Sequence, residues 1–212
     1  MPLLHRQPAT HAPPPANGED RASDAAMVLA AQRDPHAFAA LFTRYWDVVL
    51  RYCRLRLLDQ QEAEDAASQV FVDAYAGLHR FADRGAEGSF RAWLLTIAHH
   101  EVVNRHRYRA RHSASPLAAA DDVRDQNPSP EHAAIAAGDM AQVVTLLGQL
   151  PARSREVVEL RLAGLTDREI AAVLGISGEA VRQAQSRAVS RLCGLMGISP
   201  DTESNRKRHG HD

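Results

Sequence analysis

Hydrophobic side chains recur at three- and four-residue steps along most of the chain, which is the spacing of amphipathic helices. After Pro35 this pattern runs from Phe38 to Tyr52 and predicts one long helix. A second stripe runs from Ala66 to Leu78, and a third starts directly after Ser89, a residue type that caps helix N-termini. The three stripes predict helices that share one core.

Helical spacing resumes near Glu131 and continues to Leu150. Pro151 then opens another helix, and Gly164 follows it as a left-handed C-cap. Thr166 and Glu169 have the spacing of a capping box, in which each side chain binds a free amide of the other residue. These signals predict several short helices in the C-terminal part of the chain.

The segment from Asp167 to Leu192 has the pattern of a helix-turn-helix. Ala171 is small where two helices cross, Gly175 suits the turn, and Ser177 can cap the second helix, whose Val181 returns to the core. An ordinary helical hairpin is the alternative. A hairpin packed in a core does not explain why the outer face of the second helix is polar.

That outer face has the chemistry of a duplex-DNA reader. Arg182 and Gln183 can bind guanine or adenine edges, while Glu179 either accepts from cytosine or complements the helix dipole. Arg187 meets phosphate or solvent. The predicted duplex-binding residues are Ser177, Glu179, Arg182, Gln183, Ser186 and Arg187.

No strand pattern is present, so we predict an all-α fold of two small helical domains joined by an extended linker. Prolines and aspartates between the helical blocks indicate that linker. The predicted segments are a disordered N-terminal tail over 1–23, a first domain over 24–111, an acidic flexible linker over 112–130, a second domain over 131–197 and a flexible tail over 198–212.

Composition excludes several classes of protein. The chain has 212 residues, 45% of them hydrophobic, and a net charge of −1. No apolar run is long enough for a membrane span, and the Pro-rich start does not resemble a secretion signal, so we expect a cytoplasmic protein. Cys53 and Cys193 lie far apart and argue against a disulfide scaffold or a thiolate zinc site.

Charge is distributed in two opposite blocks. Residues 59–69 have a local charge of −4, whereas residues 89–112 carry five arginines and one glutamate, a local charge of +4. Arginines beside aromatic rings suit a single nucleic-acid strand. The predicted strand-binding residues are Trp93, His100, Asn104, Arg105, Arg107 and Arg109. Two alternatives stay open: Trp93 could be a core residue, and the acidic block could be a solvated helix face. The adjacent pair His99–His100 could suggest a metal site, but no third ligand has suitable spacing.

Two sequence blocks resemble a known family. Glu62-Ala-Glu-Asp65, Val70-Phe71 and the run from Gly88 to Ala98 resemble region 2 of the extracytoplasmic-function (ECF) sigma factors, within the sigma-70 family. Leu150-Pro151, Gly164-Leu165-Thr166 and the segment from Leu174 to Arg187 resemble their region 4. The blocks come in the family's order, and the linker is too short for the additional helical domain of larger sigma factors.

The resemblance implies a dissociable subunit of bacterial RNA polymerase that recognises promoters. By the same resemblance, the acidic helix docks on the clamp coiled coil of core polymerase through Glu62, Glu64, Asp65 and Gln69. The arginine helix captures the melted −10 strand, and the second domain reads the −35 duplex and contacts the polymerase flap. An anti-sigma partner is also expected, with no cofactor, no metal and no catalytic residue.

Several residues depart from the family pattern. Ser68-Gln69 stands where Gln-Glu is common, and His100 stands where Asn is common, which suggests a pH-dependent −10 contact. Ala184 and Gln185 replace a basic and an aliphatic residue, so the second domain is expected to pack less firmly or to use a partner.

Two other readings remain. A conventional helix-turn-helix regulator with a sensing or dimerising N-terminal lobe explains the second domain but not the succession of acidic and basic blocks. A DNA-acting enzyme would need a carboxylate cluster, a nucleophile motif or a phosphate-binding glycine loop, and the sequence offers none of these.

Overall fold

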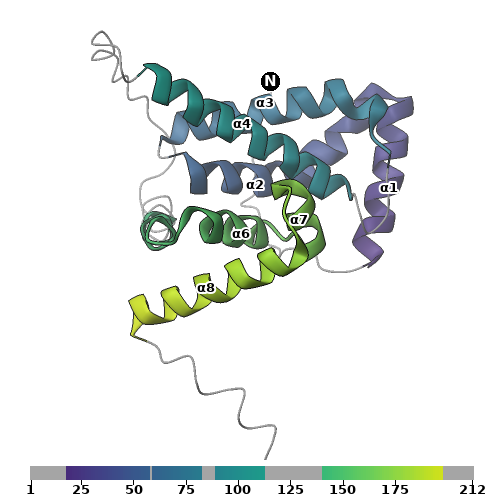
Figure 1. The fold of residues 1–212 in the computed structure, drawn as a ribbon. Coiled ribbons are helices and arrows are strands. Elements are labelled where there is room, and N and C mark those ends of the chain that lie inside the picture. The colour runs from purple at the N-terminus through teal and green to yellow at the C-terminus, as the bar shows by residue number, and fades with distance from the viewer. Residues whose placement is uncertain (1–17, 58, 83–88, 113–139, 198–212) are drawn as a thin grey trace, which may run out of the picture.

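The computed structural model describes residues 18–57, 59–82, 89–112 and 140–197, and all its regular elements there are helical (Figure 1). The first lobe comprises α1 (Gly18–Arg33), α2 (Phe38–Arg56), α3 (Gln60–Gly77) and α4 (Phe90–His112), with 3-10 turns η1 (Pro35–Ala37) and η2 (Leu78–Arg80). The second lobe comprises a helix over 140–148, α6 (Ala152–Leu162), α7 (Asp167–Leu174) and α8 (Gly178–Met196). The predicted all-α, two-domain architecture is confirmed.

The first lobe forms because three amphipathic helices bury one stripe each. From α2, Leu41, Tyr45 and Val49 are fully or almost fully buried. The facing side of α3 consists largely of alanines, which let the helix backbones approach closely. Ser89 caps α4 as predicted, since the Ala92 amide donates to its Oγ at 3.2 Å.

Helix α1 corrects the predicted disordered tail over 1–23, because it begins at Gly18. Tertiary contacts stabilise it. The Tyr45 hydroxyl donates to Asp24, and the Gln32 amide donates to the Leu78 and Phe81 carbonyls, each at 2.9 Å. Residues 1–17 lie outside the described part.

The predicted linker and the predicted C-terminal tail also fall outside the described residues, except for His112. That residue is the last of α4 and not the first of the linker. The domain boundaries proposed for these segments therefore stay predictions.

Local signals in the second lobe are confirmed. After α6, Gly164 has a φ of 89°, and the Leu165 amide donates back to the Leu160 carbonyl at 3.1 Å, which closes the helix end. Thr166 and Glu169 form the predicted capping box, and Gly175 takes a φ of 63° in the turn before α8. The helix-turn-helix is present.

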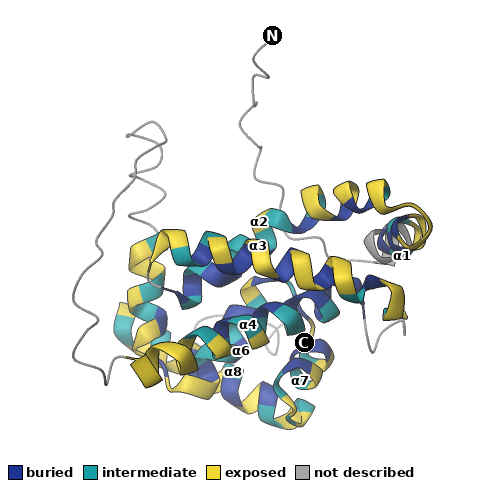
Figure 2. Cartoon of the chain, turned by 90° about the horizontal axis from the view of Figure 1, so that it is seen from above, coloured by how far each residue is buried: buried dark blue, intermediate teal, exposed yellow. Residues whose placement is uncertain are grey.

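The two lobes pack directly on each other, which the sequence pattern did not anticipate. One continuous hydrophobic core includes Leu41, Tyr52 and Leu94 from the first lobe and Leu160 and Ile170 from the second. In Figure 1, α2 lies between α3 and the second lobe, the start of α4 meets α7, and α8 lies on the far side of the second lobe. Figure 2 shows exposed residues along the outer side of α3, while the inward-facing positions are buried.

Candidate DNA and protein interfaces

The N-terminal half of α8 presents the predicted duplex-reading face to solvent. Ser177 caps the helix by accepting the Ala180 amide at 3.1 Å. Glu179 accepts hydrogen bonds from Arg182 at 2.6 Å and from Gln183 at 3.2 Å. These two bonds lower the pKa of the Glu179 carboxyl. The six residues predicted on this face are all exposed: Ser177, Glu179, Arg182, Gln183, Ser186 and Arg187.

Glu179 therefore has a role that neither sequence reading included. It holds Arg182 and Gln183 together on the helix surface. Because the Arg182–Glu179 pair is about 60% exposed on both sides, it is a weak contact that DNA can replace. The side chains of this α8 face are therefore held in place, but they remain accessible to a ligand.

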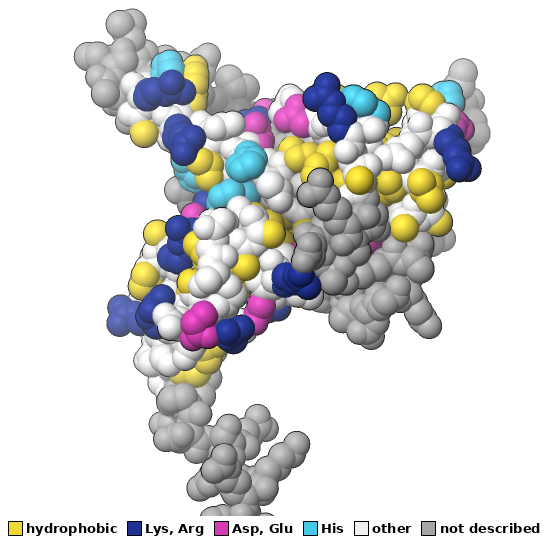
Figure 3. Space-filling model, turned by 45° about the vertical axis from the view of Figure 1, so that its right-hand side comes forward, with side chains coloured by type: hydrophobic (Ala, Val, Ile, Leu, Met, Phe, Trp, Pro, Cys, Tyr) yellow, Lys and Arg dark blue, Asp and Glu magenta, His cyan; other side chains and the backbone are white. Residues whose placement is uncertain are grey.

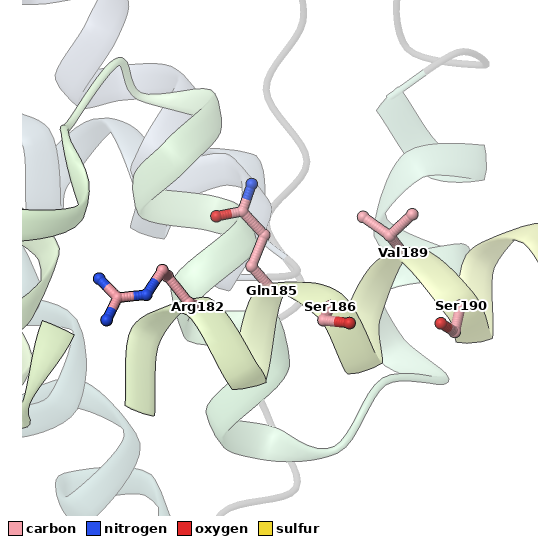
Figure 4. Close-up of a pocket in the computed structure, with 5 residues that line it drawn as sticks. All are labelled: Arg182, Gln185, Ser186, Val189 and Ser190. Atoms are coloured by element: carbon pink, nitrogen blue, oxygen red, sulfur yellow. The ribbon is translucent and has the colours of Figure 1, made fainter. Parts of the chain in front are cut away.

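A shallow hollow of about 370 Å³ runs along α8 and is lined by Arg182, Gln185, Ser186, Val189 and Ser190 (Figure 4). In Figure 4, Gln185 and Val189 point to the same side of the helix. Gln185 accepts a hydrogen bond from Arg161 of α6 at 3.2 Å, and Arg161 also donates to the Leu165 carbonyl at 2.8 Å.

The side-chain oxygen of Gln185 thus has a partner within its own lobe. Ala184 is fully buried, where a longer side chain would not fit without rearrangement. The expectation of looser packing at these two positions is not what the structure shows. The sequence pattern did not identify Arg161, because its contacts arise only where α6, α7 and α8 meet.

Along α4, the predicted strand-binding residues divide into two groups. Trp93, His100, Asn104 and Arg107 follow one another at steps of seven, four and three and share one face of the helix. We call these four residues the α4 stripe. His100, Asn104 and Arg107 are exposed, and Arg111 continues the same line. In Figure 3, basic and histidine side chains gather over the projecting end of the molecule, where α4 ends.

Trp93 is only partly available to a ligand. Its ring lies 5.0 Å from that of Phe81 and 5.6 Å from that of Phe90, between ring centroids. It also covers Gly77 so closely that an added Cβ there would lie 3.2 Å from the indole. Trp93 is therefore a partly buried residue at the edge of the core, with some of its surface open to solvent.

Arg105 and Arg109 lie off the α4 stripe, on a different side of the helix from Arg107. Arg105 donates to Glu101 at 2.7 Å, one turn earlier on α4. Arg109 pairs with Glu62 of α3. Both arginines pair with glutamates of the first lobe, although the Arg109 side chain is still 43% exposed, and Arg107 is exposed on the α4 stripe.

The two adjacent histidines have opposite surroundings. His100 is exposed, whereas His99 faces inward, with its Nδ1 3.1 Å from the Tyr52 hydroxyl. Burial and the nearby Arg56 guanidinium lower the pKa of His99. Within the described ranges, no three potential ligands among His, Cys, Asp and Glu are grouped as a metal site requires.

The predicted polymerase-binding residues on α3 also divide. Glu62 is paired with Arg109, and Glu64 accepts from Arg54 at 2.9 Å. Asp65 and Gln69 are exposed, and their hydrogen bonds to described residues run along α3: Asp65 accepts from Gln61 at 3.1 Å, and Gln69 donates to Asp73 at 2.8 Å.

The outer face of α3 contains apolar residues that the sequence analysis did not include. Val72 is 59% exposed and Tyr75 is 50% exposed. Val72 follows Asp65 and Gln69 at steps of four and three, so helical spacing alone could have placed it on this face. The candidate protein-binding surface is thus acidic and apolar together.

Comparisons with known proteins agree with both lobes. Residues 41–112 match the family model of Sigma-70 region 2, and residues 146–192 match that of Sigma-70 region 4. In the described part of the chain, no helix is long and apolar enough to cross a membrane.

Two curated relatives are similar over most of their length. The ECF RNA polymerase sigma factor SigD of Mycobacterium tuberculosis (strain ATCC 25618 / H37Rv) is 35% identical over 174 residues, which cover 80% of this chain and 81% of SigD. The ECF RNA polymerase sigma factor ShbA of Streptomyces griseus is 37% identical over 175 residues, covering 78% of this chain and 91% of ShbA.

Solved structures show the same fold. CnrH in complex with the cytosolic domain of CnrY is 27% identical, with a TM-score of 0.63 over 82% of this chain and 97% of that one. The sigma factor RpoE of Bartonella quintana, in complex with the anti-sigma factor NepR, is 22% identical, with a TM-score of 0.61 over 76% of this chain and 98% of that one. With both region models matched in order, the chain belongs to the ECF subfamily of the sigma-70 family of RNA polymerase sigma factors.

Proposed function

We propose that this chain binds core RNA polymerase and directs it to promoters by reading a −35 duplex with α8 and holding the melted −10 strand with the α4 stripe. The observation that carries the proposal is the presence, in one chain, of an exposed helix-turn-helix face and a separate arginine-bearing helix beside an acidic one. Its expected place of action is the cytoplasm, where polymerase and promoters are found.

For the −35 element, α8 enters the major groove with its N-terminus toward a phosphate. The free amides of the first turn and the Ser177 hydroxyl favour an anion there. Arg182 leaves Glu179 to bind a guanine edge, and Gln183 is one step further along the helix for the adjacent base. Ser186 and Arg187, further along, bind the phosphate backbone and set the register.

For the −10 element, the α4 stripe supplies a ring, two polar side chains and a cation in order along one face. The partly buried Trp93 ring offers its open side as a stacking surface, and Arg107 binds phosphate. His100 and Asn104 lie between them and contact an unstacked base. Strand opening costs a few kcal/mol for each flipped base, which these contacts must offset.

For core polymerase, the exposed Asp65 and Gln69 on α3 dock on the clamp coiled coil, with Val72 adding apolar contact. Glu62 and Glu64 join after exchanging their internal arginine partners for basic groups of the polymerase. The second lobe contacts the flap, and an anti-sigma protein holds the chain inactive until a signal releases it.

The test is transcription by core polymerase that lacks any sigma subunit, with the purified chain and genomic DNA added and the transcripts sequenced. Specific start sites preceded by a shared pair of elements are expected. Tight binding of the free chain to duplex DNA, without any effect on polymerase, would instead support a conventional helix-turn-helix regulator.

A further inference from the structure

Helix α1 lies outside the part of the chain that matches Sigma-70 region 2, although it packs on the first lobe. The match begins at residue 41, whereas α1 spans Gly18–Arg33 and stands at one edge of that lobe (Figure 1). Val28 and Ala31 of α1 are buried in the hydrophobic core. The family likeness therefore assigns α1 no task, and its contacts must indicate what it does.

The first half of α1 is fixed to α2 by a buried carboxylate. Asp24 is only 6% exposed, accepts a hydrogen bond from the Tyr45 hydroxyl and pairs with Arg44 at 2.9 Å. A buried charge that loses its partners is strongly destabilising, so this contact favours one position of the helix. Helix α1 thus has a fixed point on α2.

The other end of α1 reaches the turn that follows α3. Gln32 follows Asp24 by eight residues, which is about 12 Å along the helix axis. Its side-chain amide nitrogen donates to the Leu78 carbonyl and to the Phe81 carbonyl, each at 2.9 Å. Leu78 begins η2 and Phe81 directly follows it, so one amide spans the whole turn. Because Gln32 itself is exposed, its replacement removes both bonds without opening the core.

The turn bound by Gln32 includes a ring that supports Trp93. The ring centroids of Phe81 and Trp93 are 5.0 Å apart, and Phe81 also meets Phe90 edge-on at 5.7 Å. Packed side chains transmit a displacement to their neighbours, so a shift of the Phe81 backbone moves the Trp93 indole. Trp93 is the first residue of the α4 stripe. Contacts therefore run without a break from α2, through α1 and η2, to the start of the α4 stripe.

We propose that α1 is a positioning element for the −10 site, in which Gln32 holds η2 and Phe81 so that Trp93 presents its open side to the strand. This inference rests on the proposed function, because the melted −10 strand is the ligand. A surface that is already ordered loses less conformational freedom when the strand binds. Gln32 thus raises strand affinity through Trp93, by increasing the fraction of chains whose indole is correctly placed.

The test replaces Gln32 by Met, which preserves the length of the side chain and removes both hydrogen bonds. Gln142→Met is the matched control, since Gln142 is also exposed on a helix but belongs to the second lobe. Fluorescence anisotropy of holoenzyme measures binding to a labelled single-stranded −10 oligonucleotide and, separately, to a −35 duplex. In the free full-length chain, Trp46→Phe leaves Trp93 as the one tryptophan, and acrylamide quenching then reports how open its indole is.

We expect Gln32→Met to weaken strand binding about threefold to tenfold, the loss that fits one or two exposed hydrogen bonds. Binding to core polymerase and to the −35 duplex should stay within about twofold of wild type, and the quenching constant of Trp93 should rise. Gln142→Met should match wild type in all four measurements. Unchanged strand affinity, unchanged quenching, or an equal loss of −35 binding would each overturn the positioning role.

A measurement on the wild-type chain covers the case in which the substitution destabilises the first lobe. Coupling between two sites is reciprocal, so binding of the strand must stabilise the docked position of α1 by the same factor. Backbone amides of α1 should exchange hydrogen about threefold to tenfold more slowly in holoenzyme with the −10 oligonucleotide than without it. Equal exchange rates would contradict the inference. A wild-type holoenzyme that binds no −10 strand would refute the proposed function, while the quenching of Trp93 would still decide whether Gln32 holds the indole.

Discussion

The division of the α4 arginines makes a quantitative prediction for strand capture. Arg107 is exposed on the α4 stripe, whereas Arg105 is held by Glu101 at 2.7 Å. Replacing Arg107 by Gln removes one charge-assisted contact to phosphate, which is worth about 1 kcal/mol, or roughly a fivefold loss of affinity. It should also reduce the slope of log affinity against log salt by about 0.7, the value for one phosphate on a single strand.

The assay is fluorescence anisotropy of holoenzyme with a labelled single-stranded −10 oligonucleotide, from about 50 to 200 mM salt. Across that fourfold range, a slope change of 0.7 makes the defect about 2.6-fold smaller at the high-salt end. Arg105→Gln is the matched control on the same helix and should lose less than about twofold, with an unchanged slope. Equal losses for the two variants, or a loss confined to particular −10 sequences, would refute the assignment.

Three further predictions follow from the other surfaces. Arg182→Ala should cost about 1–3 kcal/mol of holoenzyme binding to its −35 duplex and relax base preference there, measured by competition among variant duplexes; an unchanged preference would contradict base reading by Arg182. Asp65→Lys should weaken core polymerase binding several-fold more than Asp47→Lys, the same charge change at an exposed position of α2, measured by interferometry, and an equal effect would remove α3 as the docking face. Because burial and Arg56 lower the pKa of His99, the unfolded chain takes up a proton on this ring first, so the free energy of unfolding should fall as pH drops below about 6.5 and be retained above it. Urea unfolding at pH 5.5 and 7.5 should show a smaller difference in His99→Gln than in wild type, where Tyr52, Arg56, Glu156, Arg153 and His100 are the other groups near the ring.

Features set by neighbouring residues could be predicted from the sequence. Gly164, the Thr166–Glu169 capping box and the Ser177 cap are local, because each joins groups within a few residues and has few alternatives. The same holds for the exposed face of α8, since helical spacing and a polar outer side are enough to define it.

Features that depend on contacts between residues far apart in the chain could not be predicted from the sequence. Helix α1 has a polar sequence and is anchored by Tyr45 and by carbonyls near residue 80, so its own pattern says little. The Arg56–Glu159 contact joins positions more than 100 residues apart, and periodicity identifies a buried face without naming its partner. Arg105 and Arg109 are a different case, because their helical angles already separate them from Arg107.

The pairing of Arg109 with Glu62 has a consequence for the free chain in the cell. The strongest basic segment and the strongest acidic segment are brought together, and part of each charge is cancelled at short range. A protein with an uncovered arginine helix would adhere to any RNA or DNA that it met and lose time there. The Arg109–Glu62 pair takes one arginine of α4 out of that attraction, while Arg107 and Arg111 stay exposed for a nucleic-acid strand.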